Sequence, residues 1–169
     1  MAKVTLTELQ SLPDPLTSDL YEFVIGRIPG GGGDTNVLRI QCQQVTVPSK
    51  TIEPVNVDLH SNTVVFAGRM TFSHDMSITF VENRKMDVFK ILNTWAEYCR
   101  NKQTQLGNYK ADYSTTAELY VYDQIGQVIQ TFRFYGLWIN TLPEYQFDSS
   151  AANLITAAAT FQYDYYEAV

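Results

Sequence analysis

One segment of this sequence has the spacing of an amphipathic helix, and most of the remaining chain alternates as strands do. Between Arg84 and Arg100, apolar residues recur every three or four positions and form a single stripe. The stripe consists of Val88, Phe89, Leu92, Trp95, Ala96 and Cys99. A lone helix of this kind needs a sheet to bury its stripe, so the sequence predicts a mainly β fold with one helix packed on a sheet.

The rest of the chain supplies short alternating segments separated by turn residues. The strongest turn signal is Pro29–Asp34, and the turn residues Asp123–Gly126 predict a hairpin between their two flanking strands. Strands are expected over residues 19–28, 37–47, 63–66, 70–81, 117–122, 127–139, 145–147 and 154–165. Together they predict an antiparallel β-sandwich or small barrel, built by a single domain of residues 19–169.

Two segments contain too few apolar residues to pack by themselves. Residues 1–18 are polar and broken by Pro13 and Pro15, and we expect an arm with a short helical turn around Leu6–Leu12. Residues 48–62 are expected to form a projecting loop with irregular strand pairing. Long ordered loops in compact domains are usually functional. We therefore expect both segments to become ordered on a neighbouring subunit, for which β-augmentation is one route.

Composition excludes several classes of function. The chain has 169 residues and a net charge of -6, and it shows no basic stripe of the kind that binds a phosphate backbone. Its densest basic spot, Arg84, Lys85 and Lys90, is interrupted by acidic residues and is interpreted as a solvated helix face. The N-terminus lacks the apolar segment of a signal peptide, and no apolar run is long enough to span a bilayer. Cys42 and Cys99 are expected to be reduced core residues, which fits a reducing compartment.

The residues that usually carry chemistry do not converge. His60 and His74 each have a single neighbouring carboxylate, which is common by chance, so both are interpreted as surface histidines. A phosphate-binding loop at Gly30–Gly33 would need a following helix and a lysine, whereas a strand is expected there, so the run is interpreted as a hairpin tip. Ser149–Ser150 lies in a turn and not in a nucleophile elbow. The sequence therefore predicts no cofactor, no metal and no enzymatic activity.

Several stretches, in order along the chain, resemble the tail tube proteins of contractile-tailed phages, which are related to the tube proteins of type VI secretion systems. They are Cys42–Pro48, Ala67–Phe72 with its A-G-x-x-T-F pattern, the helix, Tyr135–Trp138 with its Y-G-L-W step, and the closing segment Tyr163–Glu167. The resemblance extends over roughly residues 20–167. Its motif core is Gly68, Phe72, Trp95, Gly136 and Trp138. The Gly30–Gly33 insertion departs from the family pattern, in which a short turn is expected.

The resemblance implies a structural role. Six copies would form a ring whose sheets join into a continuous β-barrel, and rings would stack into a hollow tube inside a contractile sheath. Baseplate and tail terminator proteins would bind its two ends, and genome DNA would pass through without specific binding. The protein would be part of the virion, assembled in the cytoplasm of the host bacterium. An acidic subunit suits such a conduit because like charge keeps a polyanion from adhering to the wall.

Two sets of residues are candidates for assembly contacts under this resemblance. The small and polar face of the last predicted strand would line the channel or contact a neighbour: Thr156, Ala158, Thr160, Gln162 and Asp164. The projecting loop would contact the next ring through Lys50, Glu53, Asp58 and His60. Three alternatives remain: a tube initiator or tube-like baseplate protein, the tube of a type VI or bacteriocin-like injection system, and a small β-barrel that binds a ligand or is an enzyme.

Overall fold

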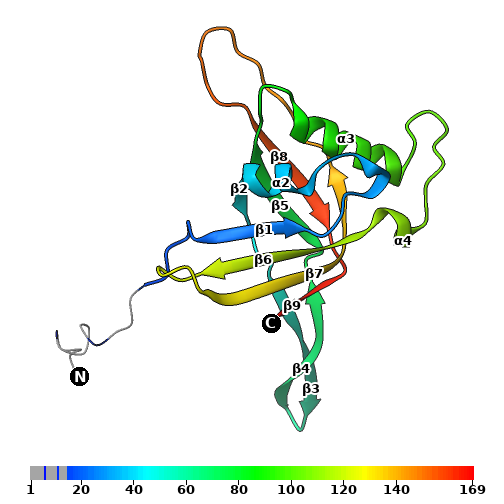
Figure 1. Ribbon diagram of the computed structural model, residues 1–169. Coiled ribbons are helices and arrows are strands. Elements are labelled where there is room, and N and C mark those ends of the chain that lie inside the picture. Colours follow the sequence, from blue (N-terminus) through cyan, green and yellow to red (C-terminus); the bar gives the residue numbers. More distant parts are fainter. Residues whose placement is uncertain (1–5, 7–10, 12–14) are drawn as a thin grey trace.

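The structure is a computed structural model that describes Leu6, Ser11 and residues 15–169. The arm predicted over residues 1–18, with its helical turn around Leu6–Leu12, lies mostly outside the described residues. In chain order the elements are β1 (Tyr21–Ile25), η1 (Pro29–Gly31), α2 (Thr35–Gln41), β2 (Cys42–Val45), β3 (Lys50–Leu59), β4 (Asn62–Phe72), β5 (Asp75–Val81), α3 (Asp87–Cys99), α4 (Lys110–Tyr113), β6 (Thr115–Tyr122), β7 (Val128–Thr141), β8 (Thr156–Gln162) and β9 (Tyr165–Ala168) (Figure 1).

The strands form one large antiparallel sheet and one separate two-stranded ribbon. In the large sheet the order is β1-β6-β7-β8-β5-β2, with β9 paired to β7, and the ribbon is β3-β4. The long strand β7 belongs to two layers: its first half pairs with β6 and β9, and its end pairs with β8. The prediction of a mainly β, antiparallel fold with one amphipathic helix is confirmed. The sheet does not close into a barrel within one chain, because β1 and β2 remain at the two ends of the strand order.

Helix α3 covers one face of the sheet with its apolar stripe. Val88, Ile91, Leu92 and Trp95 are buried, and the Trp95 ring lies 5.6 Å from that of Phe161 on β8. The predicted stripe differs from the buried one at two positions. Ile91, which the prediction omitted, is buried, and Phe89, which it included, lies at the margin of the stripe. Phe89 is 38% exposed because it packs edge-on against Tyr145 at the rim of the core and not beneath the helix.

The structure of the glycine run and of the segment after it differs from the prediction. Residues 35–41 form helix α2, and only Cys42–Val45 of the predicted strand 37–47 is extended. The run is not a free hairpin tip, because a β-carbon on Gly33 would lie 2.6 Å from Cγ1 of Ile91 on α3. The helix that follows does not restore a phosphate loop: the Asp34 carboxylate itself caps the first turn, accepting a hydrogen bond from the Asn36 N–H at 2.9 Å.

The end of the chain also differs from the prediction. The expected strand 154–165 is divided into β8 and β9, because the chain leaves β5 and pairs with the first half of β7 after Tyr163. The alternation therefore shifts by one residue: Tyr163 and Tyr166 are buried, whereas Tyr165 is 42% exposed. The short strand expected over 145–147 is absent from this part of the described chain, where the backbone is irregular.

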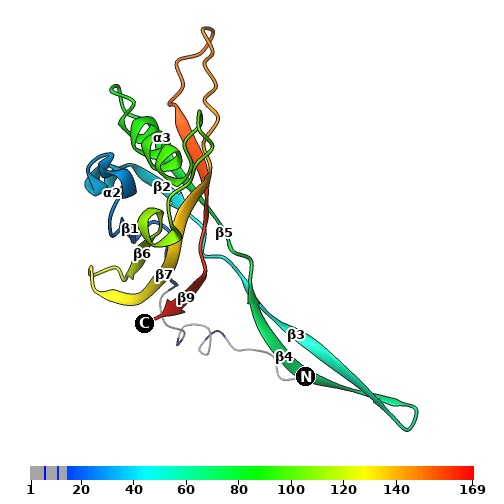
Figure 2. The same ribbon diagram turned by 90° about the vertical axis from the view of Figure 1, so that its right-hand side faces the viewer.

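The segment expected as an irregular loop is regular strand. Residues 50–59 pair with 62–72 along nearly their whole length and form a ribbon that leaves the body of the molecule (Figure 2). Ten residues of strand correspond to about 33 Å at the usual rise per residue. The predicted strand 63–66 and the first residues of the predicted strand 70–81 both belong to β4, and β5 begins at Asp75.

Candidate assembly surfaces

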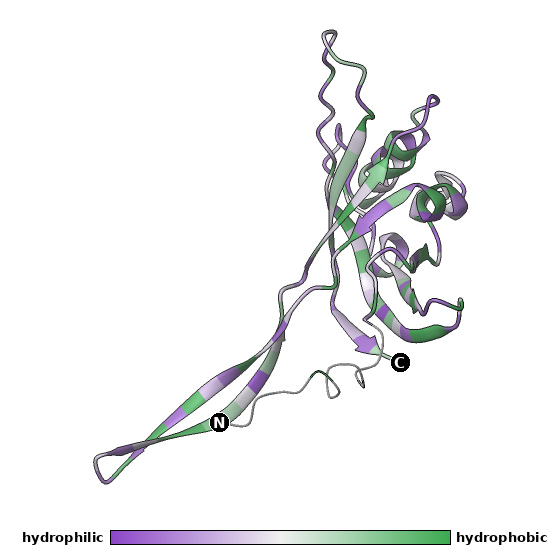
Figure 3. Ribbon diagram, turned by 90° about the vertical axis from the view of Figure 1, so that its left-hand side faces the viewer, coloured by the Kyte–Doolittle hydropathy of each residue, from purple (hydrophilic) through white to green (hydrophobic). Residues whose placement is uncertain are grey.

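The β3–β4 ribbon has one apolar face that nothing in the described chain covers. Cross-strand pairing sets Val55 beside Phe66 and Val57 beside Val64, with Leu59 next in line toward the tip. The large apolar residues of the ribbon, these among them, are between 36% and 62% exposed. Figure 3 shows the apolar segments alternating with polar ones along both strands. An exposed apolar strip of this size is characteristic of a binding surface.

The opposite face of the ribbon is more polar. Asn56 and Asp58 belong to it, and the Thr63 hydroxyl donates a hydrogen bond of 2.6 Å to the Asp58 carboxylate. The four predicted contact residues are all exposed on the ribbon or its tip: Lys50, Glu53, Asp58 and His60. Sequence reasoning named these charged residues and missed the apolar strip beside them. The alternation of Val55, Val57 and Leu59 is the signal that could have revealed it.

The base of the ribbon is fixed to the body by aromatic contacts. Phe72, at the end of β4, packs edge-on against Tyr166 with ring centroids 5.6 Å apart. The Tyr166 hydroxyl donates a hydrogen bond of 2.9 Å to the Pro48 carbonyl, and the Lys50 ammonium lies 5.4 Å from the Tyr166 ring centroid. Farther out, Gly68 sits where the two strands cross closely, since a β-carbon there would lie 2.6 Å from the Glu53 carbonyl oxygen. The ribbon is thus held in a defined direction at its base.

The exposed face of β8 is small and almost neutral. Antiparallel pairing places Thr156, Ala158, Thr160 and Gln162 beside Val81, Thr79, Ser77 and Asp75 of β5. Large apolar residues of both strands point to the opposite face, toward α3. The Gln162 amide donates to the Asp75 carboxylate at one end. The four predicted channel-lining residues on β8 therefore share one solvent-facing surface of hydroxyl, methyl and amide groups.

Asp164 is placed differently from the other candidates. It lies in the break between β8 and β9, where its carboxylate forms an ion pair of 2.5 Å with Lys110. Its backbone N–H donates to the Tyr135 carbonyl at 2.9 Å, and its side chain lies against Gly136. Asp164 thus helps to hold the bend of β7, and it does not continue the β8 surface.

The two tryptophans of the predicted motif core both contact Tyr113. Trp95 is fully buried, and its indole N–H donates a hydrogen bond of 2.8 Å to the Tyr113 carbonyl. The Trp138 ring packs edge-on against the Tyr113 ring at 5.8 Å. These contacts connect α3, α4 and β7, so both tryptophans stabilise the fold.

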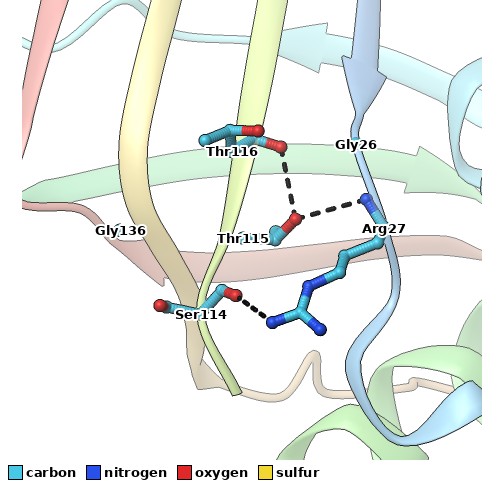
Figure 4. A pocket seen from close by; sticks show the side chains of 6 residues that line it. All are labelled: Gly26, Arg27, Ser114, Thr115, Thr116 and Gly136. Atoms are coloured by element: carbon cyan, nitrogen blue, oxygen red, sulfur yellow. Dashed lines mark hydrogen bonds between the residues drawn. The ribbon is translucent and has the colours of Figure 1, made fainter. Parts of the chain in front are cut away.

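A hollow of about 400 Å³ lies between the end of β1 and the start of β6 (Figure 4). The Arg27 guanidinium donates through Nη2 to three backbone carbonyls at the end of α4: those of Ala111, Asp112 and Ser114, at 2.9 to 3.1 Å. The Arg27 N–H donates to Thr115 Oγ1 at 3.2 Å. The polar groups of this hollow satisfy one another, as expected of a structural connection between two segments.

Acidic side chains on the outer face of β1 and β6 are held by tyrosines and arginines. Glu118 accepts hydrogen bonds from Tyr120 and from Arg133 Nε, the latter at 2.6 Å, and these bonds lower the pKa of its carboxyl group. Glu22 accepts from Tyr122 at 2.8 Å and from Arg39 at 2.6 Å, and its pKa is lowered in the same way. The carboxylates are stabilised in their charged form.

The described residues contain no group of three His, Cys, Asp or Glu side chains able to hold a metal ion. His74 Nδ1 lies 3.0 Å from the Tyr163 carbonyl oxygen, and His60 lies at the ribbon tip. Burial raises the pKa of the Cys42 and Cys99 thiols to about 11, and both cysteines are free. Within the described part of the chain, no helix has the length and hydropathy needed to cross a membrane.

Comparison with solved structures identifies the fold. A chain of the PVC sheath–tube complex of an extracellular contractile injection system, in the extended state, matches with a TM-score of 0.66 and 11% identity, over 99% of both chains. The PVC sheath/tube terminator matches with a TM-score of 0.69 and 11% identity, over 94% of this chain and 99% of the other. The tube-terminating cap of the anti-feeding prophage gives 0.69 and 10%, over 94% and 93%. A search of curated protein sequences gave no significant match.

The fold is therefore one found in the particles of contractile injection systems. The chain belongs to the phage tail tube protein family, whose sequence pattern matches residues 15–169. That family consists of structural tube proteins and not of enzymes, which contradicts the alternative of an enzymatic or ligand-binding small barrel.

Proposed function

We propose that this protein is the main tube subunit of a contractile phage tail, in which six copies form a ring and rings stack into a hollow conduit for genome DNA. The observation that carries the proposal is the β3–β4 ribbon, whose apolar face is exposed over its length. Such a surface costs free energy in a monomer and is buried in an assembly. Rings of identical copies bury it in every subunit.

The sheet itself favours ring closure. β1 and β2 lie at the ends of the strand order and each presents an edge that can pair with a strand of another subunit. Six such sheets joined edge to edge form a continuous barrel, with the helices outside. The β8 surface of Thr156, Ala158, Thr160 and Gln162 then faces the channel. Its neutral groups and the overall charge of -6 offer DNA little to bind.

In this proposal the sheath surrounds the tube, the baseplate and the tail terminator bind its ends, and the tube is assembled in the host cytoplasm before it becomes part of the virion. A second candidate is the tube or tube initiator of a related injection particle. It is favoured by the likeness to the PVC and anti-feeding prophage chains. The two candidates differ in what passes through the channel.

Electron microscopy of the purified full-length protein tests the proposal. Six-fold rings or hollow tubes are expected. A protein that stays monomeric at all concentrations contradicts it. Mass spectrometry of particles purified from producing cells separates the two candidates, since a phage tail is recovered attached to a DNA-filled head and an injection particle is not.

A further inference from the structure

A second projection lies at the end of the molecule opposite to the ribbon. Residues 142–155, between β7 and β8, form a long loop without helix or strand. Figures 1 and 2 both show this loop at the top of the molecule and the β3–β4 ribbon at the bottom. Loops of more than about 12–15 residues without structure of their own are uncommon in compact domains and are usually functional.

The two sides of this loop enclose an open hollow. Its volume is about 860 Å³. Five apolar residues line it, Phe147, Ala151, Leu154, Ile155 and Ala158, together with the polar residues Glu144, Gln146, Asp148, Ser149, Asn153 and Thr156. Phe147 is 70% exposed and Leu154 80% exposed. The described chain thus leaves apolar side chains uncovered here too. The ribbon and the loop both leave apolar side chains exposed. Because they lie at opposite ends of the molecule, they cannot cover each other within one chain.

We propose that the apolar face of the ribbon, Val55, Val57, Leu59, Val64 and Phe66, docks in the loop hollow of a second copy of this chain in the next ring. This inference rests on the proposed function and adds the surface that receives the ribbon. Two different surfaces at opposite ends make a heterologous contact, which does not close on itself and so generates an open stack. A tube built from stacked rings requires that kind of contact between successive rings.

Charge along the outer part of the ribbon agrees with this pairing. The loop carries Glu144 and Asp148 and no lysine or arginine, whereas the ribbon carries two cations, Lys50 and Arg69, and two carboxylates, Glu53 and Asp58. Asp58 lies on the face opposite to the apolar strip and is bonded to Thr63, and Glu53 lies near the base, at the irregularity in pairing between Ile52 and Pro54. From Val55 to the tip, the apolar strip therefore brings no carboxylate into the acidic loop.

The docking has a consequence for the channel. Of the four β8 residues that the proposed function places on the channel surface, Thr156 and Ala158 also line the hollow, so docking of the ribbon moves these two into the contact between rings. Thr160 and Gln162, farther along β8, remain for the channel surface.

A cysteine trap in assembled tubes tests the inference. Leu59→Cys on the ribbon and Leu154→Cys on the loop are prepared as separate proteins, mixed, assembled and oxidised, and disulfide-linked dimers are measured on non-reducing gels. Ile40→Cys on α2, which is 75% exposed, replaces Leu154→Cys in the control mixture. The native Cys42 and Cys99 are half-buried and are present in every sample.

Dimers are expected in the Leu59→Cys and Leu154→Cys mixture, and only at background level in the control mixture and in either protein alone. Tubes that form without this cross-link overturn the inference and leave the proposed function standing. Leu59→Cys protein that cross-links to itself overturns the head-to-tail arrangement. Wild-type protein that forms no rings or tubes contradicts both proposals.

A charge substitution gives a second readout. Leu154→Asp is expected to abolish tubes while six-fold rings persist in electron micrographs, whereas Ile40→Asp leaves tubes intact. Tubes of normal length from the Leu154→Asp variant contradict the inference.

Discussion

Asp164 lies so close to Gly136 that no side chain fits between them. A β-carbon on Gly136 would lie 2.7 Å from Asp164 Cγ, and the backbone of Gly136 has a φ of 68°. The glycine marks the bend of β7, where the strand passes from the layer of β6 and β9 to that of β8. Both the contact and the backbone angle require glycine.

We therefore expect Gly136→Ala to destabilise the monomer by more than the cost of a left-handed backbone alone, which is about 1–2 kcal/mol. Gly126→Ala is the matched control, because Gly126 has a φ of 82° with nothing within 4 Å of its added β-carbon. Urea unfolding of both variants provides the comparison. Equal losses of unfolding free energy would show that the Asp164 contact has no effect.

Glu82 caps helix α3 from outside the helix. Met86, at the N-cap position, makes no side-chain bond, and the Glu82 carboxylate instead accepts from the N–H groups of Val88 and Phe89 at 3.2 and 3.0 Å. The Tyr145 hydroxyl donates to the same carboxylate at 2.9 Å. Because a negative charge at a helix N-terminus is favourable, Glu82→Gln is expected to cost about 1 kcal/mol of unfolding free energy.

Glu53→Gln serves as the control for Glu82→Gln, since it removes a carboxylate from the exposed ribbon. Thermal melting monitored by circular dichroism compares the two variants with wild type. An unchanged melting temperature for Glu82→Gln would mean that a neutral amide oxygen caps α3 as well as the carboxylate does.

The paired carboxylates of Glu22 and Glu118 predict a loss of stability in acid. In the folded state a hydrogen bond from Tyr122 lowers the pKa of Glu22 below its ordinary value of 4.5, and a hydrogen bond from Tyr120 does the same for Glu118. A folded-state pKa below the unfolded one stabilises the protein above about pH 4.5, and this stabilisation is lost as the pH falls through the folded pKa. Urea midpoints should therefore change little from pH 7 to about pH 5 and fall between about pH 4.5 and pH 3.

Glu118→Gln should make that decline shallower, because the variant has one fewer carboxylate to protonate. Glu144→Gln, in the exposed loop, is the comparison variant. The assignment would be wrong if both variants followed the wild-type pH profile.

Because the apolar face of the ribbon is exposed in the monomer, we expect substitutions on it to impair assembly without changing the stability of the monomer. Val57→Asp places a charge on the apolar face, so we expect it to prevent tube formation while the monomer melts at the wild-type temperature. Asn56→Asp adds the same charge to the neighbouring position on the opposite face and should be tolerated. Sedimentation and electron microscopy at one protein concentration distinguish the variants. Equal impairment by both would show that net charge, and not the apolar face, controls assembly.

Local patterns in the sequence predicted the elements that are set by local contacts. The stripe from Val88 to Trp95 identifies α3 because helix periodicity is a property of neighbouring residues. The turn at Asp123–Gly126 predicts the β6–β7 hairpin for the same reason, and Asp123 Oδ1 accepts from the N–H groups of Ile125 and Gln127. The motif-core residues all occupy positions where packing or backbone geometry restricts the choice of side chain.

The missed features depend on contacts distant in sequence. Gly33 is a packing glycine only because α3 lies against it, and α2 was hidden by the turn pattern of the preceding glycines, although Asp34 supplied an N-cap signal. The division of the last strand follows from its pairing with β7, which no alternation pattern contains. The apolar strip and the loop hollow can be recognised as surfaces only when the body that fails to cover them is known.

The β3–β4 ribbon is the direct extension of β2 and β5, and this connection determines how the protein bears mechanical load. A pull on the ribbon along its length reaches β5, which is held between β2 and β8 by hydrogen bonds roughly perpendicular to the strands. Such a force shears the whole ladder together, so the bonds share the load and do not open one after another. A subunit gripped by its ribbon can thus transmit axial tension into its core sheet without first unfolding the segment that is gripped.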